Sequence, residues 1–258
     1  MCKYKAVFFD IDGTLLSHRT GKVPDSTLEA LARLRENHIH TVISSGRHPT
    51  ELKQLNIDLS YYDSFITTNG QIVLDRSWNI IAENPIPEDK RPILVKAFEE
   101  KRIPMQINTI DELYMNFIND RVRRVLEEIH TPLHDVGQYR GEKLFQVVAY
   151  VEDIDAPWVE EISKHFHVTS WHSNGIDIIT NNGGKAWGIE AYLKAMGFDR
   201  KQTVAFGDGA NDLEMISYSG CGIAMGNAVD SLKEAADLVT DDIDEDGLYN
   251  ACRKIGLF

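Results

Sequence analysis

Apolar residues gather in short runs along the first eighty residues of the chain. A wholly apolar run lies at residues 6–9, and shorter apolar pairs mark strands at 41–44 and 65–67; each is followed by glycine or polar residues. Runs of this length are typical of strands that are covered on both faces. Helical patterns separate the runs, so we expect a parallel sheet with right-handed crossovers.

The segment between the first two runs has the pattern of an amphipathic helix. Ser26 and Glu29 have the spacing of a capping box, which predicts that the helix begins near Ser26. Leu28, Leu31 and Leu34 recur at helical spacing and form its predicted buried stripe.

The pattern changes between residues 83 and 183. Here the sequence predicts helix, two strands, helix, strand, helix and two strands. The second helix carries an apolar stripe formed by Val122, Val125, Leu126 and Ile129. The clearest strand covers 144–150. Strands that follow one another without a helix indicate hairpins, so we expect an α+β unit with a largely antiparallel sheet.

Strands and helices alternate again after residue 184. Ile189, Leu193 and Met196 mark a helix that Gly197 ends, and strands are predicted at 203–206, 222–225 and 238–240. The pattern predicts an α/β core formed by 1–82 and 184–258, into which 83–183 is inserted as a separate domain. An insert of roughly 100 residues is within the usual size of a domain.

Composition narrows the class of protein. The 258 residues carry a net charge of −13 without a basic block, which argues against nucleic acid as a partner. Cys2, Cys221 and Cys252 form no CxxC pair, so we expect a reducing cytoplasm rather than a disulfide framework. No apolar run approaches about 20 residues, and no signal-peptide pattern is present, so we expect no membrane contact.

Two carboxylates and a hydroxyl follow the first predicted strand, at Asp10, Asp12 and Thr14. Ligands of open α/β sheets bind at the carboxyl ends of such strands. Neighbouring acids are costly without a cation, and Mg²⁺ with a phosphate would satisfy all three groups. One carboxylate can attack phosphorus, and the second can protonate the leaving oxygen. The alternative is a plain Asp-Gly-Thr turn.

Three further segments carry polar groups at the end of a strand or the start of a helix. Ser45 and Gly46 can hold phosphate oxygens, and Lys185 can neutralise them near a helix N-terminus. Asp208 can join Asp10 as a ligand of Mg²⁺, with Asp212 as an outer partner for bound water. A solvated lysine, a plain turn and an acidic helix cap are the alternatives.

Together these segments resemble the four motifs of the haloacid dehalogenase superfamily. The matching segments, in the order of the family, are Asp10-Ile11-Asp12-Gly13-Thr14-Leu15-Leu16, Ser45-Gly46-Arg47, Lys185 and Gly207-Asp208-Gly209-Ala210-Asn211-Asp212. The position of the insert and Asn69-Gly70 resemble the Cof-like sugar-phosphatase branch, which has the larger α/β cap. The resemblance implies a Rossmann-like core with an inserted cap. Ser44-Ser45 replaces the commoner Ala-Thr and keeps the hydroxyl.

The resemblance also implies an activity: Mg²⁺-dependent hydrolysis of a small phosphomonoester through an aspartyl-phosphate. It implies that Asp10 is the nucleophile and Asp12 the general acid and base, with Lys185 as the third catalytic residue. The implied ligands of Mg²⁺ are Asp10, the Asp12 carbonyl and Asp208. The implied contacts to phosphate or substrate are Thr14, Ser45, Gly46, Arg47, Asn69 and Asn211.

Several alternatives stay open. A phosphomutase or phosphotransferase would use the same nucleophile, and a non-catalytic binding protein could keep the same fold. The insert is expected to act as a lid. Asn174 and Asp177 are candidates for contacts to the substrate, although Asn174-Gly175 is also typical of a hairpin turn. We expect a monomer or a weak homodimer whose partner is a small phosphate ester.

Overall fold

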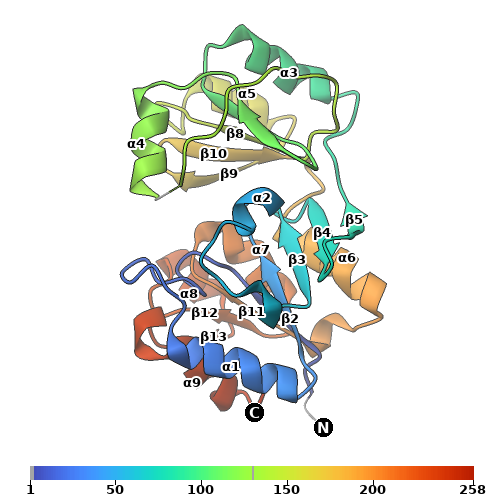
Figure 1. Ribbon diagram of the computed structural model, residues 1–258, viewed down its shortest axis with the longest axis vertical. Coiled ribbons are helices and arrows are strands. Elements are labelled where there is room, and N and C mark those ends of the chain that lie inside the picture. Colours follow the sequence, from blue (N-terminus) through green and yellow to red (C-terminus); the bar gives the residue numbers. More distant parts are fainter. Residues whose placement is uncertain (1–2, 130) are drawn as a thin grey trace. The chain divides into compact units, whose positions relative to one another are not determined.

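The computed structural model describes residues 3–129 and 131–258, and the chain divides into two compact units (Figure 1). Unit 1 comprises the chain up to Arg47, Glu51–Glu83 and Gly184–Phe258, and unit 2 comprises His48–Thr50 and Asn84–Gly183. The sequence places the insert at 83–183 and gives no sign that His48–Thr50 belongs with it. His48 Nε2 lies 3.1 Å from the Thr109 carbonyl oxygen within unit 2. Cys2 lies outside the described residues.

Unit 1 is built on one twisted sheet with the strand order β13-β12-β11-β1-β2-β3-β4-β5. Every pair from β13 to β3 is parallel, whereas β3–β4 and β4–β5 are antiparallel. The strands are β1 (Ala6–Phe9), β2 (His40–Ser44), β3 (Ser64–Thr67), β4 (Ile72–Asp75), β5 (Ile80–Glu83), β11 (Thr203–Gly207), β12 (Gly222–Ala224) and β13 (Leu238–Val239). The α/β fold class with a parallel core is confirmed.

The antiparallel edge of this sheet corrects the expected alternation of strand and helix over the first eighty residues. Thr68 and Asn69 both have φ of +50°, and Gly70 has φ of +87°. Three consecutive left-handed residues reverse the chain at once, so β4 returns beside β3 and no helix fits between them.

The helices of unit 1 cover both faces of the sheet. Helices α6 (Lys185–Met196), α7 (Leu213–Tyr218) and α8 (Asp230–Ala235) supply the residues that pack on Val42, Ile66 and Ala205. Helix α1 (Asp25–Glu36) packs against β2 and against α9 (Gly247–Lys254). Single turns of 3₁₀ helix lie at Leu59–Tyr61, Arg200–Gln202, Ala210–Asp212 and Ile243–Glu245. The chain passes from unit 2 back to unit 1 between Thr50 and Glu51, within the short helix α2 (Pro49–Leu52).

Helix α1 begins at Asp25, close to the predicted start, but its N-terminus is capped differently from the prediction. Pro24 is the N-cap, no side chain caps the helix, and Ser26 lies inside the first turn with its Oγ unpartnered among the described residues. Pro24 has φ of −59°, which begins the helix before Ser26, so the predicted capping box is wrong. Leu31 and Leu34 are buried as expected, but Leu28 is only half-buried. The predicted end of α6 at Gly197 is confirmed.

Unit 2 contains a five-stranded antiparallel sheet with the order β7-β6-β8-β10-β9. Its elements are α3 (Arg91–Glu100), β6 (Met105–Asn108), β7 (Leu113–Met115), α4 (Asp120–Glu128), β8 (Gln146–Ala149), α5 (Pro157–Ser163), β9 (His167–His172) and β10 (Gly175–Ile179). The order of these helices and strands along the chain confirms the predicted order of helix, two strands, helix, strand, helix and two strands.

The described residues of unit 2 form two hydrophobic clusters. Helices α3 and α5 pack on the aliphatic residues of β6, β8 and β10, and α4 packs on Val148 and Tyr150 through its predicted stripe. Among the described residues, no helix of either unit has both the length and the apolar character that a membrane span requires.

Candidate active site

The candidate site lies where two adjacent parallel strands of unit 1 end. Strand β1 is completely buried and runs into Asp10, and its neighbour β11 runs into Asp208. The ladder pairs Phe9 with Phe206, and the Asp10 N–H donates to the Phe206 carbonyl at 3.0 Å. This register brings the carboxylates of Asp10 and Asp208 to the same edge of the sheet.

Lys185 is the first residue of α6 and its side chain is 1% exposed. Its Nζ donates to Asp10 Oδ1 at 2.5 Å and to Asp212 Oδ1 at 2.6 Å. The buried ammonium therefore bridges two carboxylates that come from opposite ends of the chain. Because the ammonium donor is charged, these hydrogen bonds are of the strong, charge-assisted kind.

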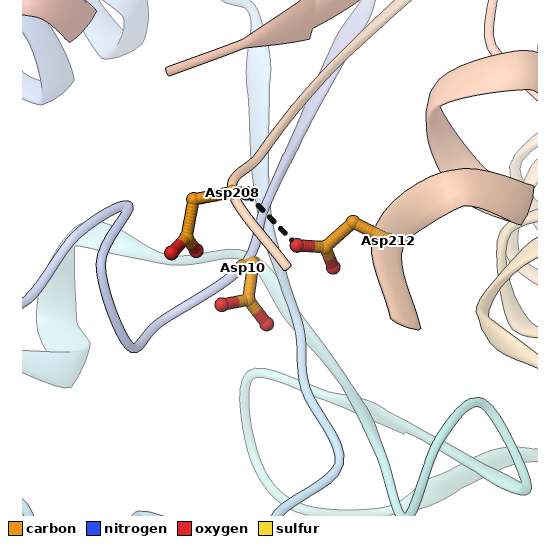
Figure 2. Close-up of side chains that lie close together, drawn as sticks. All are labelled: Asp10, Asp208 and Asp212. Carbon is orange, nitrogen blue, oxygen red and sulfur yellow. Dashed lines mark hydrogen bonds between the residues drawn. The ribbon is translucent and has the colours of Figure 1, made fainter. Parts of the chain in front are cut away.

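Asp212 also holds the loop that carries Asp208. Its Oδ2 accepts the N–H groups of Asp208 at 2.9 Å and of Gly209 at 3.0 Å, and Figure 2 shows the first of these bonds. Both oxygens of Asp212 are therefore engaged, one by Lys185 and one by backbone. The sequence suggested Asp212 as an outer partner for bound water. In the structure its carboxylate fixes the backbone of the Asp208 loop.

The carboxylates of this cluster repel one another. Burial raises the pKa of Asp10 well above its ordinary value, and the charge of Asp212 adds to the shift, against the opposing effect of Lys185. Burial and Asp212 raise the pKa of Asp208 to about 7. Burial alone would lower the pKa of Lys185, but Asp10 and Asp212 outweigh it and hold that pKa above its usual range.

These acids suit a divalent cation. Asp10, Asp208 and Asp212 each offer an oxygen within 4.8 Å of the others (Figure 2). The donors are all carboxylate oxygens, which Mg²⁺ prefers over nitrogen or sulfur. A cation would also relieve the repulsion that raises the pKa values of Asp10 and Asp208. The residues present therefore fit Mg²⁺, with Asp10 and Asp208 as the better ligands because Asp212 is already engaged.

Asp12 has a partner that the sequence did not suggest. Arg47 donates from Nε to Asp12 Oδ2 and from Nη2 to Oδ1, both at 2.8 Å. The side chains of Asp12 and Arg47 are 36% and 19% exposed, respectively, so this ion pair lies at the surface of the cluster. The residues are 35 positions apart, and no local pattern in the sequence links them.

The remaining predicted phosphate contacts lie at neighbouring strand ends. Thr14 Oγ1 donates to Asp208 Oδ1 at 3.2 Å, and Ser45 Oγ accepts the Arg47 N–H at 3.2 Å. The Asn69 N–H donates to the Ser45 carbonyl at 3.1 Å. A Cβ placed on Gly46 would lie 3.1 Å from Asn69 Oδ1, so the absence of a side chain there lets Asn69 approach.

Asn211 and the two candidates of unit 2 each have neighbours within their own unit. Asn211 lies in the 3₁₀ turn after Asp208, and its Oδ1 would be 2.5 Å from a Cβ on Gly209. Asn174 lies between the antiparallel strands β9 and β10, where Gly175 pairs with His172, which supports the interpretation as a hairpin turn. Its Nδ2 donates to the carbonyls of Val151 and Glu152, each at 3.0 Å. Asp177 Oδ1 accepts the indole N–H of Trp171 at 3.1 Å.

Sequence reasoning missed one residue beside the site, Asn227. Its Nδ2 donates to the Gly13 carbonyl at 2.8 Å, and its Oδ1 accepts the Ile243 N–H at 3.0 Å. Asn227 and Gly13 are 214 positions apart, and an asparagine after a strand is typical of an ordinary turn.

Comparison with known proteins agrees with this geometry. A family model described as haloacid dehalogenase-like hydrolase matches residues 7–252. The Bacillus subtilis (strain 168) protein YkrA, provisionally named a phosphatase, is 36% identical over 98% of both chains. The Escherichia coli (strain K12) pyridoxal phosphate phosphatase YbhA is 28% identical, with 95% of this chain and 96% of YbhA covered.

A solved structure supports the same family at the level of the fold. The structure of BT4131, described as a subclass IIB sugar phosphatase, superimposes with a TM-score of 0.88 at 28% identity, over 98% of this chain and 100% of BT4131. The family that the four motifs predicted is thereby confirmed: the chain belongs to the haloacid dehalogenase-like hydrolases, in their Cof-like phosphatase branch.

Proposed function

We propose that the protein is a Mg²⁺-dependent phosphomonoesterase that hydrolyses a small phosphorylated metabolite through an aspartyl-phosphate. The observation that carries this proposal is the cluster at the ends of β1 and β11. There Lys185 bridges Asp10 and Asp212, and Asp208 lies within reach of the same cation. A structural ion pair needs one carboxylate for each ammonium, and this cluster has excess negative charge that a cation would balance.

In the first half of the reaction, a carboxylate oxygen of Asp10 attacks phosphorus. The bond from phosphorus to the leaving oxygen breaks, and Asp12 gives its proton to that oxygen. Bound Mg²⁺, held by Asp10, the Asp12 carbonyl and Asp208, would neutralise the negative charge that the acids and the phosphoryl oxygens bring together. Lys185 would supply further positive charge to the phosphoryl oxygens.

In the second half, Asp12 takes a proton from water as the water oxygen attacks the phosphorus of the aspartyl-phosphate. Phosphate leaves, and the Asp10 carboxylate is regenerated. Thr14, Ser45 and Gly46 lie at the strand ends where they would bind the phosphoryl oxygens by side chain or backbone N–H. Arg47 donates to both oxygens of Asp12 and thereby fixes the orientation of that carboxyl group.

We propose sugar phosphates as the first substrates to test. BT4131 is described as a sugar phosphatase and YbhA is named a pyridoxal phosphate phosphatase, so relatives of similar identity differ in substrate. The substrates in both names are small phosphorylated metabolites.

Release of phosphate by the purified protein tests the proposal. We expect turnover of para-nitrophenyl phosphate and of some member of a sugar-phosphate panel with Mg²⁺, and none with EDTA. Asp10→Asn should lose nearly all turnover while its circular dichroism stays native. Interconversion of hexose 1- and 6-phosphates faster than phosphate release would instead indicate a phosphomutase. Binding without turnover would indicate a non-catalytic protein.

A further inference from the structure

The five-residue segment Met225–Val229, which follows β12, contacts the loop that carries Asp208. The Met225 N–H donates to the Gly207 carbonyl at 3.0 Å, and the Val229 N–H donates to the Asp208 carbonyl at 2.9 Å. The backbone carbonyls on both sides of the Asp208 Cα are therefore held by one segment, which we call the bracket.

The bracket also contacts the loop that carries Asp10 and Asp12. At its centre, Asn227 donates from Nδ2 to the Gly13 carbonyl at 2.8 Å. Its Oδ1 accepts the Ile243 N–H at 3.0 Å, so the amide cannot rotate without breaking two bonds. One short segment thus holds two loops whose strands, β1 and β11, are neighbours in the sheet.

The position of Gly13 affects Asp208 directly. Gly13 has φ of +84°, and a Cβ placed on it would overlap the Asp208 carboxylate. The next residue, Thr14, donates to Asp208 Oδ1 at 3.2 Å. The sheet fixes the bases of the two loops, but their tips lie beyond the strands. A shift of the Gly13 peptide would move Asp208 relative to Asp10.

We propose that Asn227 is a positioning residue for the divalent-cation site, which it supports by holding the Gly13 carbonyl at a fixed distance from the Asp208 loop. This inference rests on the proposed function, because it presupposes that Asp10 and Asp208 bind a cation. Groups that orient metal ligands through hydrogen bonds typically change metal affinity by about 10- to 100-fold when they are removed.

A neighbouring contact provides a matched control. Asp244 lies in the 3₁₀ turn that Asn227 contacts through Ile243, and it accepts from Ser17 Oγ and from Arg19 Nε, both at 2.8 Å. It therefore ties that turn to the chain after Asp12, at residues farther along the sequence than Gly13. Asp244→Ala removes this anchor but leaves the bonds of Asn227 intact. If anchoring of the loop in general were what matters, Asp244→Ala would affect the cation as strongly as a change at Asn227.

The test measures binding of Mn²⁺ to the purified protein by electron paramagnetic resonance and of Mg²⁺ by titration calorimetry. We expect Asn227→Ala to raise both dissociation constants about tenfold or more, with kcat at saturating Mg²⁺ within roughly threefold of the wild type. Asn227→Asp keeps the acceptor for Ile243 and loses the donor to Gly13, but it adds a negative charge that attracts the cation, so it should weaken binding by less than Asn227→Ala does. Asp244→Ala should stay within about twofold, because it orients no ligand of the cation.

Wild-type affinity in both Asn227 variants would overturn the inference and leave the proposed function standing. Equal weakening by Asp244→Ala would also overturn it, because the effect would then belong to the loop as a whole. A wild-type protein that binds neither cation would overturn the inference and the metal dependence of the proposed function together. Circular dichroism of each variant establishes that it is folded, and Asn227→Asp provides the result if Asn227→Ala does not fold.

Discussion

Replacement of Lys185 by methionine should lower the stability of the metal-free protein more than any exposed ion pair could. Lys185 is 1% exposed and lies within 2.6 Å of oxygens of both Asp10 and Asp212. Methionine fills a similar volume without charge, so the cavity it leaves is small. The change therefore isolates the loss of the ammonium from a cluster of buried carboxylates.

The expected magnitude follows from the burial of this pair. Removal of one partner of a buried ion pair typically costs about 3–5 kcal/mol, because the other charge stays buried and uncompensated. In a protein of this size each kcal/mol corresponds to roughly 2–4 °C in the melting temperature. Lys185→Met should therefore melt about 6–20 °C below the wild type in EDTA. Excess Mg²⁺ should narrow that difference, because the cation binds the same carboxylates.

Asp10→Asn is the matched control. Because the pKa of Asp10 is higher in the folded protein than in the unfolded chain, ionised Asp10 destabilises the fold at neutral pH. The neutral amide should therefore melt at or above the wild-type temperature in EDTA, and the double variant with Lys185→Met should recover part of the loss. Differential scanning calorimetry of the four proteins measures this. A Lys185→Met protein that melts within about 2 °C of the wild type in EDTA would refute the reasoning.

Two further predictions concern residues around the cluster. Arg47→Ala should cost at most about 1 kcal/mol of stability, since its pair with Asp12 is partly exposed, yet it should lower kcat about tenfold or more. Arg47→Lys should recover little of the lost kcat, because an ammonium cannot bond both oxygens as a guanidinium does. An unchanged kcat in Arg47→Ala would contradict the positioning of Asp12 by Arg47. Gly70→Ala should cost about 1–3 kcal/mol in urea unfolding, because φ is +87° and the new Cβ would overlap the Gly184 carbonyl. Gly21→Ala, at φ of +64° with open space around it, should cost less, and equal losses would show that the overlap is unimportant.

Much of the fold follows from local patterns. The apolar run Ala6–Phe9 before Asp10 identifies a buried strand and its end, and both are confirmed. The order of helices and strands in 83–183 is likewise predicted, because each element has its own period of apolar residues. The predicted end of α6 at Gly197 has a local cause too, since that residue has φ of +69°.

The incorrect predictions concern positions where neighbouring residues determine the backbone geometry. The hairpin between β3 and β4 needs left-handed torsions at Thr68 and Asn69, which few residue types favour and which the surrounding chain imposes. The start of α1 near Ser26 is confirmed, but its predicted capping box is wrong. The spacing of Ser26 and Glu29 fits a cap, but Pro24 begins the helix first.

Local patterns in the chain identify which groups lie at the ends of strands and helices, and the motifs name the family to which they belong. The pairing of those groups depends on the folded arrangement. Lys185 and Asp10 are 175 positions apart, Arg47 and Asp12 are 35 apart, and Asn227 and Gly13 are 214 apart. Such pairs form because strand order and register bring distant ends to one edge of the sheet, and no local period in the chain records that order.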